Sequence, residues 1–180
     1  MHEQAYAAAA KRLKLLGVPF ARANADNFRS ELKALNSHDL PLLVAYRKGK
    51  RPVPYQWMHT PELIASFASK LLAPAVAPLL SVAAVLAFVD PPLEGGGDRR
   101  PPGSSAVVGF FSDPHGMEED EYAEFAEAVA PLQERGDVFV GAVSDPLVVA
   151  AFKGAKAAKA GREWVDRSPA VVVQRLGRRK

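Results

Sequence analysis

Residues 38–50 constrain the fold more than any other stretch of this 180-residue chain, because they predict a β-hairpin. Residues 42–46, Leu-Leu-Val-Ala-Tyr, form a nearly unbroken apolar run, which is typical of a strand buried on both faces of a sheet. Gly49 follows in a Lys-Gly-Lys turn, where glycine supplies the positive φ that a tight hairpin needs. Over residues 53–57 valine, tyrosine and tryptophan alternate with other residues, as in a returning strand. Pro41 stands at the start of the first strand, where a proline costs no central ladder bond and a cis peptide bond can be selected.

The composition indicates a globular chain without thiol chemistry. With 48% hydrophobic residues, the chain is long enough for one medium domain or two small ones. It contains no cysteine, which excludes disulfides, thiol redox chemistry, cysteine nucleophiles and cysteine-rich zinc sites. The formal net charge of +3 comes largely from residues 175–180, with which no aromatic residues interleave. We therefore favour a solvated tail over a nucleic-acid patch, and nucleic-acid binding is kept only as a third hypothesis.

No membrane span, metal site or cofactor site is predicted. The first residues show no basic region followed by an apolar core, so no secretory signal is visible. Residues 71–89 are apolar but contain Pro74 and Pro78, which makes them a poor membrane span. The histidines, His59 among them, are scattered and never at ligand spacing, so we expect them on the surface. The consecutive carboxylates at residues 118–121 are accounted for by a helix N-terminus.

A first unit is predicted to run helix, strand, helix, strand, strand, helix. Before the hairpin we expect a helix over residues 3–16, a strand over residues 18–23 and a helix over residues 27–35 that Asp26 caps. After the hairpin, Thr60 as N-cap with Pro61 and Glu62 begins a further helix. Its buried side is expected to carry the apolar residues at helical spacing, Leu63, Ile64, Phe67 and Leu71.

A second unit is predicted after a proline-marked connector over residues 73–81. Residues 82–89 are an apolar run that is either a strand or a short helix, which periodicity does not decide. A loop is then expected over residues 90–105, followed by a buried strand over 106–111. An amphipathic helix over 118–134, which Pro131 kinks or ends early, leads to a strand over 137–143. The last expected segments are a helix over 146–152 capped by Asp145, a Lys/Ala/Gly-rich loop, and a strand over 170–175 introduced by Ser168-Pro169.

Both halves repeat one order, which is helix, strand, helix, Xaa-Pro, strand. The alternation of strands and helices favours parallel pairing through right-handed crossovers, while the hairpin adds an antiparallel strand. This is the order of the C-terminal part of a thioredoxin-like fold. We therefore expect an α/β protein with tandem thioredoxin-like domains, each a mixed, mostly parallel sheet with flanking helices. The expected boundaries are a partial domain over residues 1–73, a linker over 74–81 and a second domain over 82–180.

Several stretches resemble the protein disulfide isomerase family. Residues 6–26 resemble the helix and strand just after the active site of an a-type domain, and Leu-Pro-Leu-Leu-Val-Ala-Tyr-Arg-Lys-Gly-Lys at residues 40–50 resembles the cis-proline strand and hairpin. Residues 73–79 resemble the a-to-b junction, and residues 107–113 resemble the first strand of a b domain. The chain departs from the family in lacking the Cys-x-x-Cys, the N-terminal βαβ part of the first domain, and the last hairpin and helix of the second. These departures favour a fragment or an internal start of a longer product over a reduced relative.

The resemblance implies a role in protein folding in the endoplasmic reticulum lumen, with unfolded or partly folded polypeptides as partners. Without a thiol, this chain cannot exchange disulfides, so enzymatic activity is left undecided and chaperone-like polypeptide binding is the leading hypothesis. The candidate peptide-binding residues are Leu40, Pro41, Tyr55 and Trp57; for the two aromatic residues, packing in the core is the alternative. The competing hypothesis is a non-enzymatic thioredoxin-like scaffold that pairs with another protein chain through open sheet edges.

Overall fold

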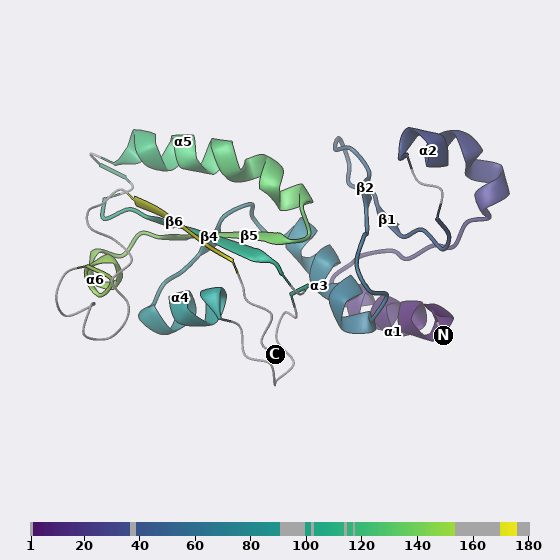
Figure 1. Ribbon diagram of the computed structural model, residues 1–180, viewed down its shortest axis with the longest axis horizontal. Helices are drawn as coiled ribbons and strands as arrows, with labels where there is room; N and C mark the ends of the chain where they lie inside the picture. The colour runs from purple at the N-terminus through teal and green to yellow at the C-terminus, as the bar shows by residue number, and fades with distance from the viewer. Residues whose placement is uncertain are drawn as a thin grey trace. The chain divides into compact units, whose positions relative to one another are not determined.

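The computed structural model describes residues 2–36, 39–90, 100–101, 103–113, 115–116, 118–153 and 170–175, and the chain divides into two compact units, Met1–Leu72 and Ala73–Lys180. The first unit contains α1 (His2–Lys14), η1 (Ala25–Phe28), α2 (Arg29–Ala34), β1 (Val44–Ala45), β2 (Val53–Pro54) and α3 (Pro61–Leu72) (Figure 1). The second contains β3 (Ala77–Pro78), α4 (Val82–Val89), β4 (Ser105–Phe110), α5 (Glu119–Val129), η2 (Ala130–Glu134), β5 (Val138–Val143), α6 (Pro146–Ala150) and β6 (Ala170–Arg175).

The two long helices of the first unit form where their sequence signals predict them. Helix α1 ends before Gly17, which has a φ of +72° as expected of a helix-terminating glycine. At the start of α3 the Leu63 amide donates to Thr60 Oγ1 over 3.4 Å, and Pro61 takes the first helical position. The core of the unit joins these helices to the hairpin and consists of Ala9, Val53, Tyr55, Leu63, Ile64, Phe67 and Leu71.

The strand predicted over residues 18–23 is wrong. The described chain shows no strand there, and the Val18 amide instead donates to Leu13 O over 3.1 Å, at the end of α1. Phe20 and Arg22 are exposed, and the small sheet of this unit contains only β1 and β2. A strand needs a neighbouring strand to satisfy its backbone groups, and among the described residues none lies alongside this segment.

The next helix begins differently from the prediction. Asn24, rather than Asp26, is the cap, because its side chain accepts a hydrogen bond of 3.0 Å from the Asp26 amide. The first turn is a 3₁₀ turn, and α2 follows over only six residues. The Asp26 carboxylate instead receives a hydrogen bond from Arg29 over 3.0 Å. No residue of η1 or α2 is buried, so local hydrogen bonds rather than core packing define this segment.

The second unit is a four-stranded sheet in the order β3-β5-β4-β6. Strands β3, β5 and β4 are mutually parallel, and β6 runs antiparallel to β4. The expected mixed, mostly parallel sheet with flanking helices is confirmed for this unit. Residues 82–89, which the sequence left open, form α4; its N-cap Ser81 accepts a hydrogen bond of 3.1 Å from the Ala84 amide.

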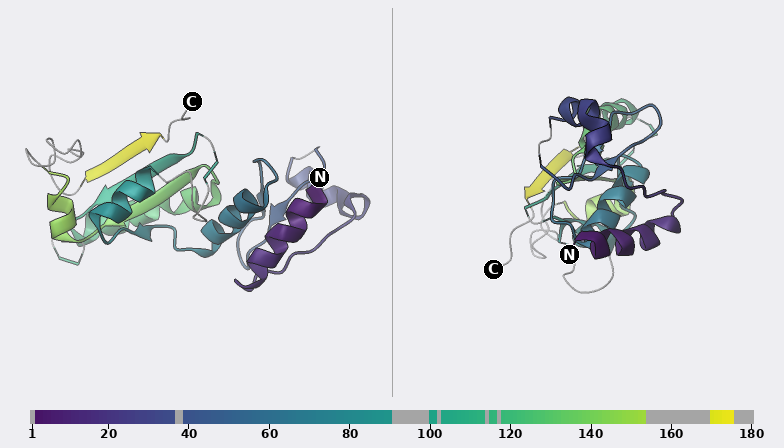
Figure 2. Two further views of the ribbon diagram at one scale, coloured as in Figure 1. Left: turned by 90° about the horizontal axis from the view of Figure 1, so that it is seen from below. Right: turned by 90° about the vertical axis from the view of Figure 1, so that its right-hand side faces the viewer.

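Helices cover both faces of this sheet. Helix α5 lies over one face, and α4 and α6 lie over the other (Figures 1 and 2). Strand β4 alternates accordingly, because Val107 packs under Phe125 and Val129 of α5, while Val108 and Phe110 pack with α4 and α6. The buried strand predicted over residues 106–111 is therefore confirmed, with both faces in contact with core residues.

Two of the predicted helices in this unit follow their local signals closely. The Asp145 carboxylate accepts hydrogen bonds from the amides of Leu147, over 2.8 Å, and Val148, over 3.4 Å, which caps α6 as predicted. Helix α5 ends at Val129, and Pro131 lies in the 3₁₀ turn η2 that follows. The predicted early end at this proline is confirmed.

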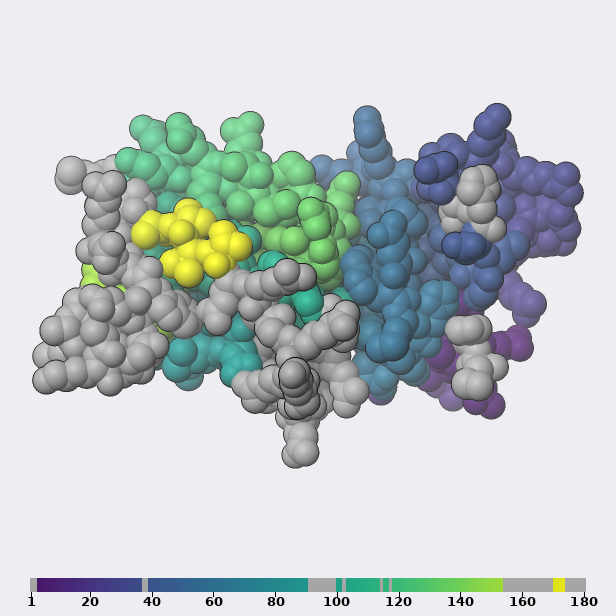
Figure 3. Space-filling model, viewed as in Figure 1, coloured from purple at the N-terminus to yellow at the C-terminus, as the bar shows by residue number. Residues whose placement is uncertain are grey.

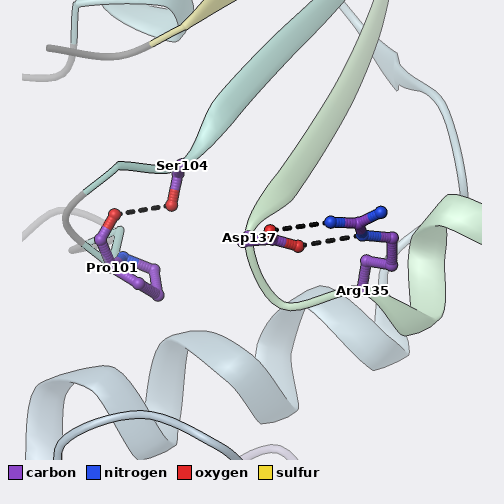
Figure 4. A network of polar contacts seen from close by, with 4 residues as sticks. All are labelled: Pro101, Ser104, Arg135 and Asp137. Atoms are coloured by element: carbon purple, nitrogen blue, oxygen red, sulfur yellow. Dashed lines mark hydrogen bonds and ion pairs between the residues drawn. The ribbon is translucent and has the colours of Figure 1, made fainter.

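Several polar contacts lie where the parallel strands β4 and β5 begin, and the side-chain contacts among them are drawn in Figure 4. The Ser105 amide donates to Asp137 O over 2.7 Å, and the buried Ser104 hydroxyl donates to Pro101 O over 2.6 Å. Arg135 forms a bidentate ion pair with the Asp137 carboxylate, in which Nε and Nη2 donate over 3.1 and 2.9 Å. That carboxylate raises the pKa of the Arg135 guanidinium above its usual value. Because the pair is solvent-exposed, its role is to fix geometry more than to add stability.

Some expectations fall outside the described residues. Most of the loop predicted over residues 90–105, the Lys/Ala/Gly-rich loop and the Ser168-Pro169 step all lie there. The stretch expected as a linker over residues 74–81 contains β3. Among the described residues, no helix is long and apolar enough to cross a membrane.

Gly109 in the centre of β4 leaves no room for a side chain. A Cβ there would stand 2.5 Å from Cε2 of Phe111 and 3.0 Å from the ring of Phe125, and both rings are buried. We expect Gly109→Ala to lower the free energy of unfolding of this unit by about 1–3 kcal/mol, measured by chemical denaturation. Adding Phe111→Leu should recover part of that loss, because it removes the ring that the new Cβ would approach most closely. A neutral Gly109→Ala variant would contradict the packing of these rings on β4.

Candidate functional site

The hairpin predicted from residues 38–50 is present, and its two strands are short. Val44 pairs with Pro54 and Ala45 with Val53 in an antiparallel ladder. Gly49 lies in the turn with a φ of +71°, and the Leu40–Pro41 peptide bond is cis. The apolar run at residues 42–46 was expected to be buried on both faces, which is wrong, because its residues are half-buried or, in the case of Tyr46, 67% exposed.

One face of the hairpin packs into the core of the first unit. Leu43, Ala45 and Trp57 contact the buried cluster that includes Val53 and Tyr55. These residues alternate along the two strands, as a sheet with one covered face requires. The other face, to which the alternation assigns Val44 and Tyr46, has no such cluster against it in the described chain.

The four predicted peptide-binding residues fall into two groups. Leu40 is 63% exposed and the cis-linked Pro41 is also exposed, so both are accessible. Tyr55 is only 4% exposed, and its ring packs edge-on against those of Trp57 and Phe67, with centroids 5.4 and 5.2 Å away. Trp57 is half-buried. The accessible part of the candidate site is therefore the segment that leads into β1.

Burial of Tyr55 also governs its ionisation. Its hydroxyl donates to Met58 O over 2.7 Å. Burial, with a smaller contribution from Tyr6, raises the pKa of Tyr55 to about 12. The phenol therefore stays neutral through the physiological range and acts as a structural donor.

His59 is a residue whose environment the sequence did not indicate. It was expected on the surface, and the structure places it half-buried with its Nδ1 2.5 Å from the Tyr6 hydroxyl in a shared hydrogen bond. Its ring lies 5.6 Å from the rings of both Tyr6 and Tyr55. The contact joins α1 to the segment before α3. Because Tyr6 and His59 are 53 residues apart in the sequence, no local sequence pattern predicts it.

The ladder geometry decides which backbone groups of the hairpin point outward. The Tyr55 amide donates to Leu43 O over 2.8 Å, so these two residues form a hydrogen-bonded pair. Antiparallel ladders alternate such pairs with pairs whose backbone groups point away from each other. Val44 and Pro54, one position along, are the latter kind. The N–H and C=O groups of Val44 and the C=O group of Pro54 therefore face the outer edges of the hairpin.

The two outer edges of the hairpin differ chemically. On β2 the outward position is Pro54, and the same register places Pro52 at the next outward position, opposite Tyr46. Proline has no N–H, so this edge cannot offer donors to another strand. On β1 the outward positions are Val44 and, by alternation, Leu42 and Tyr46, which all retain their N–H groups. The described part of the chain supplies no strand beyond β1, so only this edge is both open and competent to pair.

A basic turn adjoins the open edge. Residues 47–51 contain Arg47, Lys48, Lys50 and Arg51. Arg47 Nη1 donates to Leu71 O over 3.4 Å, which ties the turn to the end of α3, and the other three cations are exposed. No group of three or more potential metal ligands is found among the described residues.

Comparisons with known proteins give a distant structural likeness. No protein-family model matches the sequence, and no curated protein matches it either. Among solved structures, the zinc-bound form of human ERp44 matches with a TM-score of 0.40 and 14% identity, over 82% of this chain and 39% of that one. The chain is distantly similar to ERp44. A second form of human ERp44 matches with a TM-score of 0.41 and 15% identity, over 81% of this chain and 37% of that one.

ERdj5 is a further distant match. Its structure has a TM-score of 0.38 and 18% identity, over 85% of this chain and 18% of the ERdj5 chain. ERp44 and ERdj5 are thioredoxin-like proteins of the disulfide isomerase family. The present chain spans less than two fifths of the length of the ERp44 chains that it matches. With no cysteine in its sequence, it has no redox site of its own.

Proposed function

We propose that this chain is a redox-inactive, thioredoxin-like member of the protein disulfide isomerase group that binds unfolded or partly folded polypeptide. The second unit supports this assignment through its strand order, with three parallel strands, a last antiparallel strand and helices on both faces. The hairpin of β1 and β2 supports it in the first unit. The endoplasmic reticulum lumen, where the family assists folding, is the compartment that we propose with it.

The observation that carries the proposal is the difference between the two edges of the hairpin. Pro52 and Pro54 remove the donors from the β2 edge, while the β1 edge keeps its outward N–H and C=O groups at Val44 and Tyr46. Extended polypeptides bind such edges by adding a strand, with main-chain hydrogen bonds supplying affinity that depends little on sequence. A partner recognised in this way would be an unfolded chain of almost any sequence.

Side chains next to the edge favour an apolar partner. Leu42 and Val44 are half-buried, and Leu40 and Tyr46 are largely exposed. A strand added at this edge would cover apolar area, which stabilises association by about 25 cal/mol per Å² of apolar surface removed from water. Apolar segments that a folded protein would bury are the kind that an unfolded client exposes.

The proposal is tested by replacing Val44 with proline. Because the Val44 amide points outward, this change should leave the ladder bonds between β1 and β2 in place while removing a donor and blocking a third strand. We expect the dissociation constant for a fluorescently labelled unfolded protein to rise about tenfold or more. The matched control Val44→Thr keeps both the N–H and the β-branched shape, and should bind within about twofold of the original chain.

A second measurement covers the case in which the proline variant does not fold. Hydrogen exchange on the unaltered chain should show slower exchange at the amides of Val44 and Tyr46 when the unfolded client is added. Binding of the client without protection of these amides would contradict strand addition at β1. Failure of the chain to bind any unfolded protein would contradict the proposed function itself.

A further inference from the structure

The positive charge of the chain is concentrated in its first unit. Residues 1–72 contain eleven lysines and arginines against five aspartates and glutamates, which gives a formal net charge of +6. Residues 73–180 contain twelve against fifteen, a net charge of −3, although four of those cations lie within residues 175–180. The excess behind the overall charge of +3 therefore belongs to the unit that carries the candidate site.

Most carboxylates of the first unit already have partners within it. Three of the five form ion pairs, which are Arg12–Glu62, Arg22–Glu3 and Arg29–Asp26. A fourth, Glu31, accepts a hydrogen bond from the Ser30 hydroxyl over 2.7 Å. The fifth, Asp39, precedes β1, whereas the basic turn of the hairpin follows it. The carboxylates of this unit therefore do not neutralise the turn.

Three exposed cations stand together in that turn. Lys48, Lys50 and Arg51 are exposed, and none of them has an ion pair in the part of the chain that the structure describes. The end of the hairpin stands out from the rest of the first unit, as a loop in Figure 1 and as a blue projection in Figure 3. Three like charges within four residues repel one another, and an anionic partner would relieve this repulsion.

The backbone of the turn presents these cations from a defined place. The Lys50 amide donates to Arg47 O over 3.1 Å, which closes a four-residue turn with Gly49 at its third position. The hydrogen bond from Arg47 Nη1 to Leu71 O fastens the same turn to the end of α3. Because the turn is already formed, a charged partner meets it without a large cost for ordering the backbone.

We propose that the polypeptide segments bound by the first unit are acidic, with their carboxylates held beside the turn by Lys48, Lys50 and Arg51. This names the class of client for the hairpin and rests on the proposed function. Strand β1 ends at Ala45, three residues before Lys48, so a segment lying along β1 continues past the three cations. The net charge of +6 also steers acidic segments toward this unit before contact.

The surroundings of the turn favour polypeptide over nucleic acid. Surfaces that bind single-stranded nucleic acid combine a groove of cations along the backbone with several aromatic side chains on which bases stack. Here the cations form a compact group at one turn, and Tyr46 is the one exposed aromatic residue within residues 44–54. The half-buried apolar residues of β1 lie next to the turn instead, which suits a client that is apolar with acidic flanks.

The test compares two synthetic peptides with the same apolar centre, one flanked by four glutamates and the other by four glutamines. Their binding to the whole chain is measured by fluorescence anisotropy at about 10 and about 150 mM salt. We expect the glutamate peptide to bind about tenfold more tightly at the lower salt concentration. This preference should shrink at the higher one, because the screening length falls from about 30 Å to about 8 Å.

Two variants with equal changes in net charge separate the turn from the unit as a whole. K48Q/K50Q/R51Q should raise the dissociation constant for the glutamate peptide about tenfold and leave that for the glutamine peptide within about twofold. The matched control K11Q/K14Q/K33Q removes three other exposed cations of the first unit and should keep the affinity for the glutamate peptide within about threefold.

The outcomes distinguish this inference from the proposed function. Equal affinity for the two peptides would overturn the inference and leave polypeptide binding in place. Equal weakening by the two triple variants would also overturn it, because overall charge rather than the turn would then attract the client. Binding of neither peptide would overturn both proposals. A single-stranded oligonucleotide that bound more tightly than the glutamate peptide, and lost affinity in K48Q/K50Q/R51Q, would assign the turn to nucleic acid.

Discussion

Phe110→Ala is expected to lower the free energy of unfolding of the second unit by about 3–5 kcal/mol, the cost of removing a large aromatic side chain from a packed core. Phe110 is fully buried, and its ring centroid lies 5.4 Å from that of Phe152. It also belongs to the cluster that joins β4 to α4 and α6. Small domains are stable by only about 5–15 kcal/mol in total, so this one change should remove much of the stability of the unit.

The effect is measured by urea unfolding monitored by circular dichroism. Leu147→Ala is the matched control, because Leu147 lies on α6 and is exposed, and it should change stability by less than about 0.5 kcal/mol. A loss below about 1 kcal/mol for Phe110→Ala would mean that neighbouring side chains move into the space left by the ring and leave no cavity. That result would contradict the packing described for β4.

The parts of the fold that the sequence predicted well are those with local causes. Thr60-Pro61 and Asp145-Pro146 each place a side-chain acceptor and a pre-set φ at a helix start, and both helices begin there. The apolar runs of β4 and β5 likewise identify strands that helices cover on both faces. In these cases the chemistry that makes the element lies within a few residues of it.

The errors concern properties that depend on distant residues. Residues 18–23 have the composition of a strand, but the described part of the chain places no other strand beside them, and composition does not reveal that. The environment of Arg100 likewise depends on residues that are distant in the sequence. Its guanidinium lies 4.4 Å from the centroid of the Phe88 ring and 4.2 Å from that of Phe139, although the sequence indicates only a loop there.

In the candidate site, the hairpin was predictable and its pairing edge was not recognised. Prolines at alternate positions 52 and 54 are visible in the sequence, and a proline in a strand signals an edge whose N–H side faces away from its partner. Positions two apart in a strand share an edge, but without the register the sequence does not show that this edge is the outer one. That register also separates Tyr55 from the accessible residues of the site, because it places Tyr55 on the packed face.

Tyr55→Ala is therefore expected to act on stability rather than on a binding surface. It should lower the free energy of unfolding of the first unit by about 3–5 kcal/mol, because the ring is buried among those of Trp57 and Phe67. Tyr55→Phe should cost only about 1 kcal/mol, the usual value of one hydrogen bond, here the one donated to Met58 O. Both losses can be measured by chemical denaturation followed through Trp57 fluorescence in a background in which Trp164 is replaced by phenylalanine.

The same pair of variants separates packing from recognition. If Tyr55 serves the core, the Phe variant should bind an unfolded client with unchanged affinity, while binding by the Ala variant should fall only to the extent that the first unit unfolds. An intact, fully folded Phe variant with client binding weakened about tenfold would instead place the Tyr55 hydroxyl in the binding site. The proposal that a client binds at the β1 edge would then need revision. The Tyr55 hydroxyl lies on the packed face of the hairpin, where it donates to Met58 O. The outward amides of Val44 and Tyr46 lie instead along the open edge of β1.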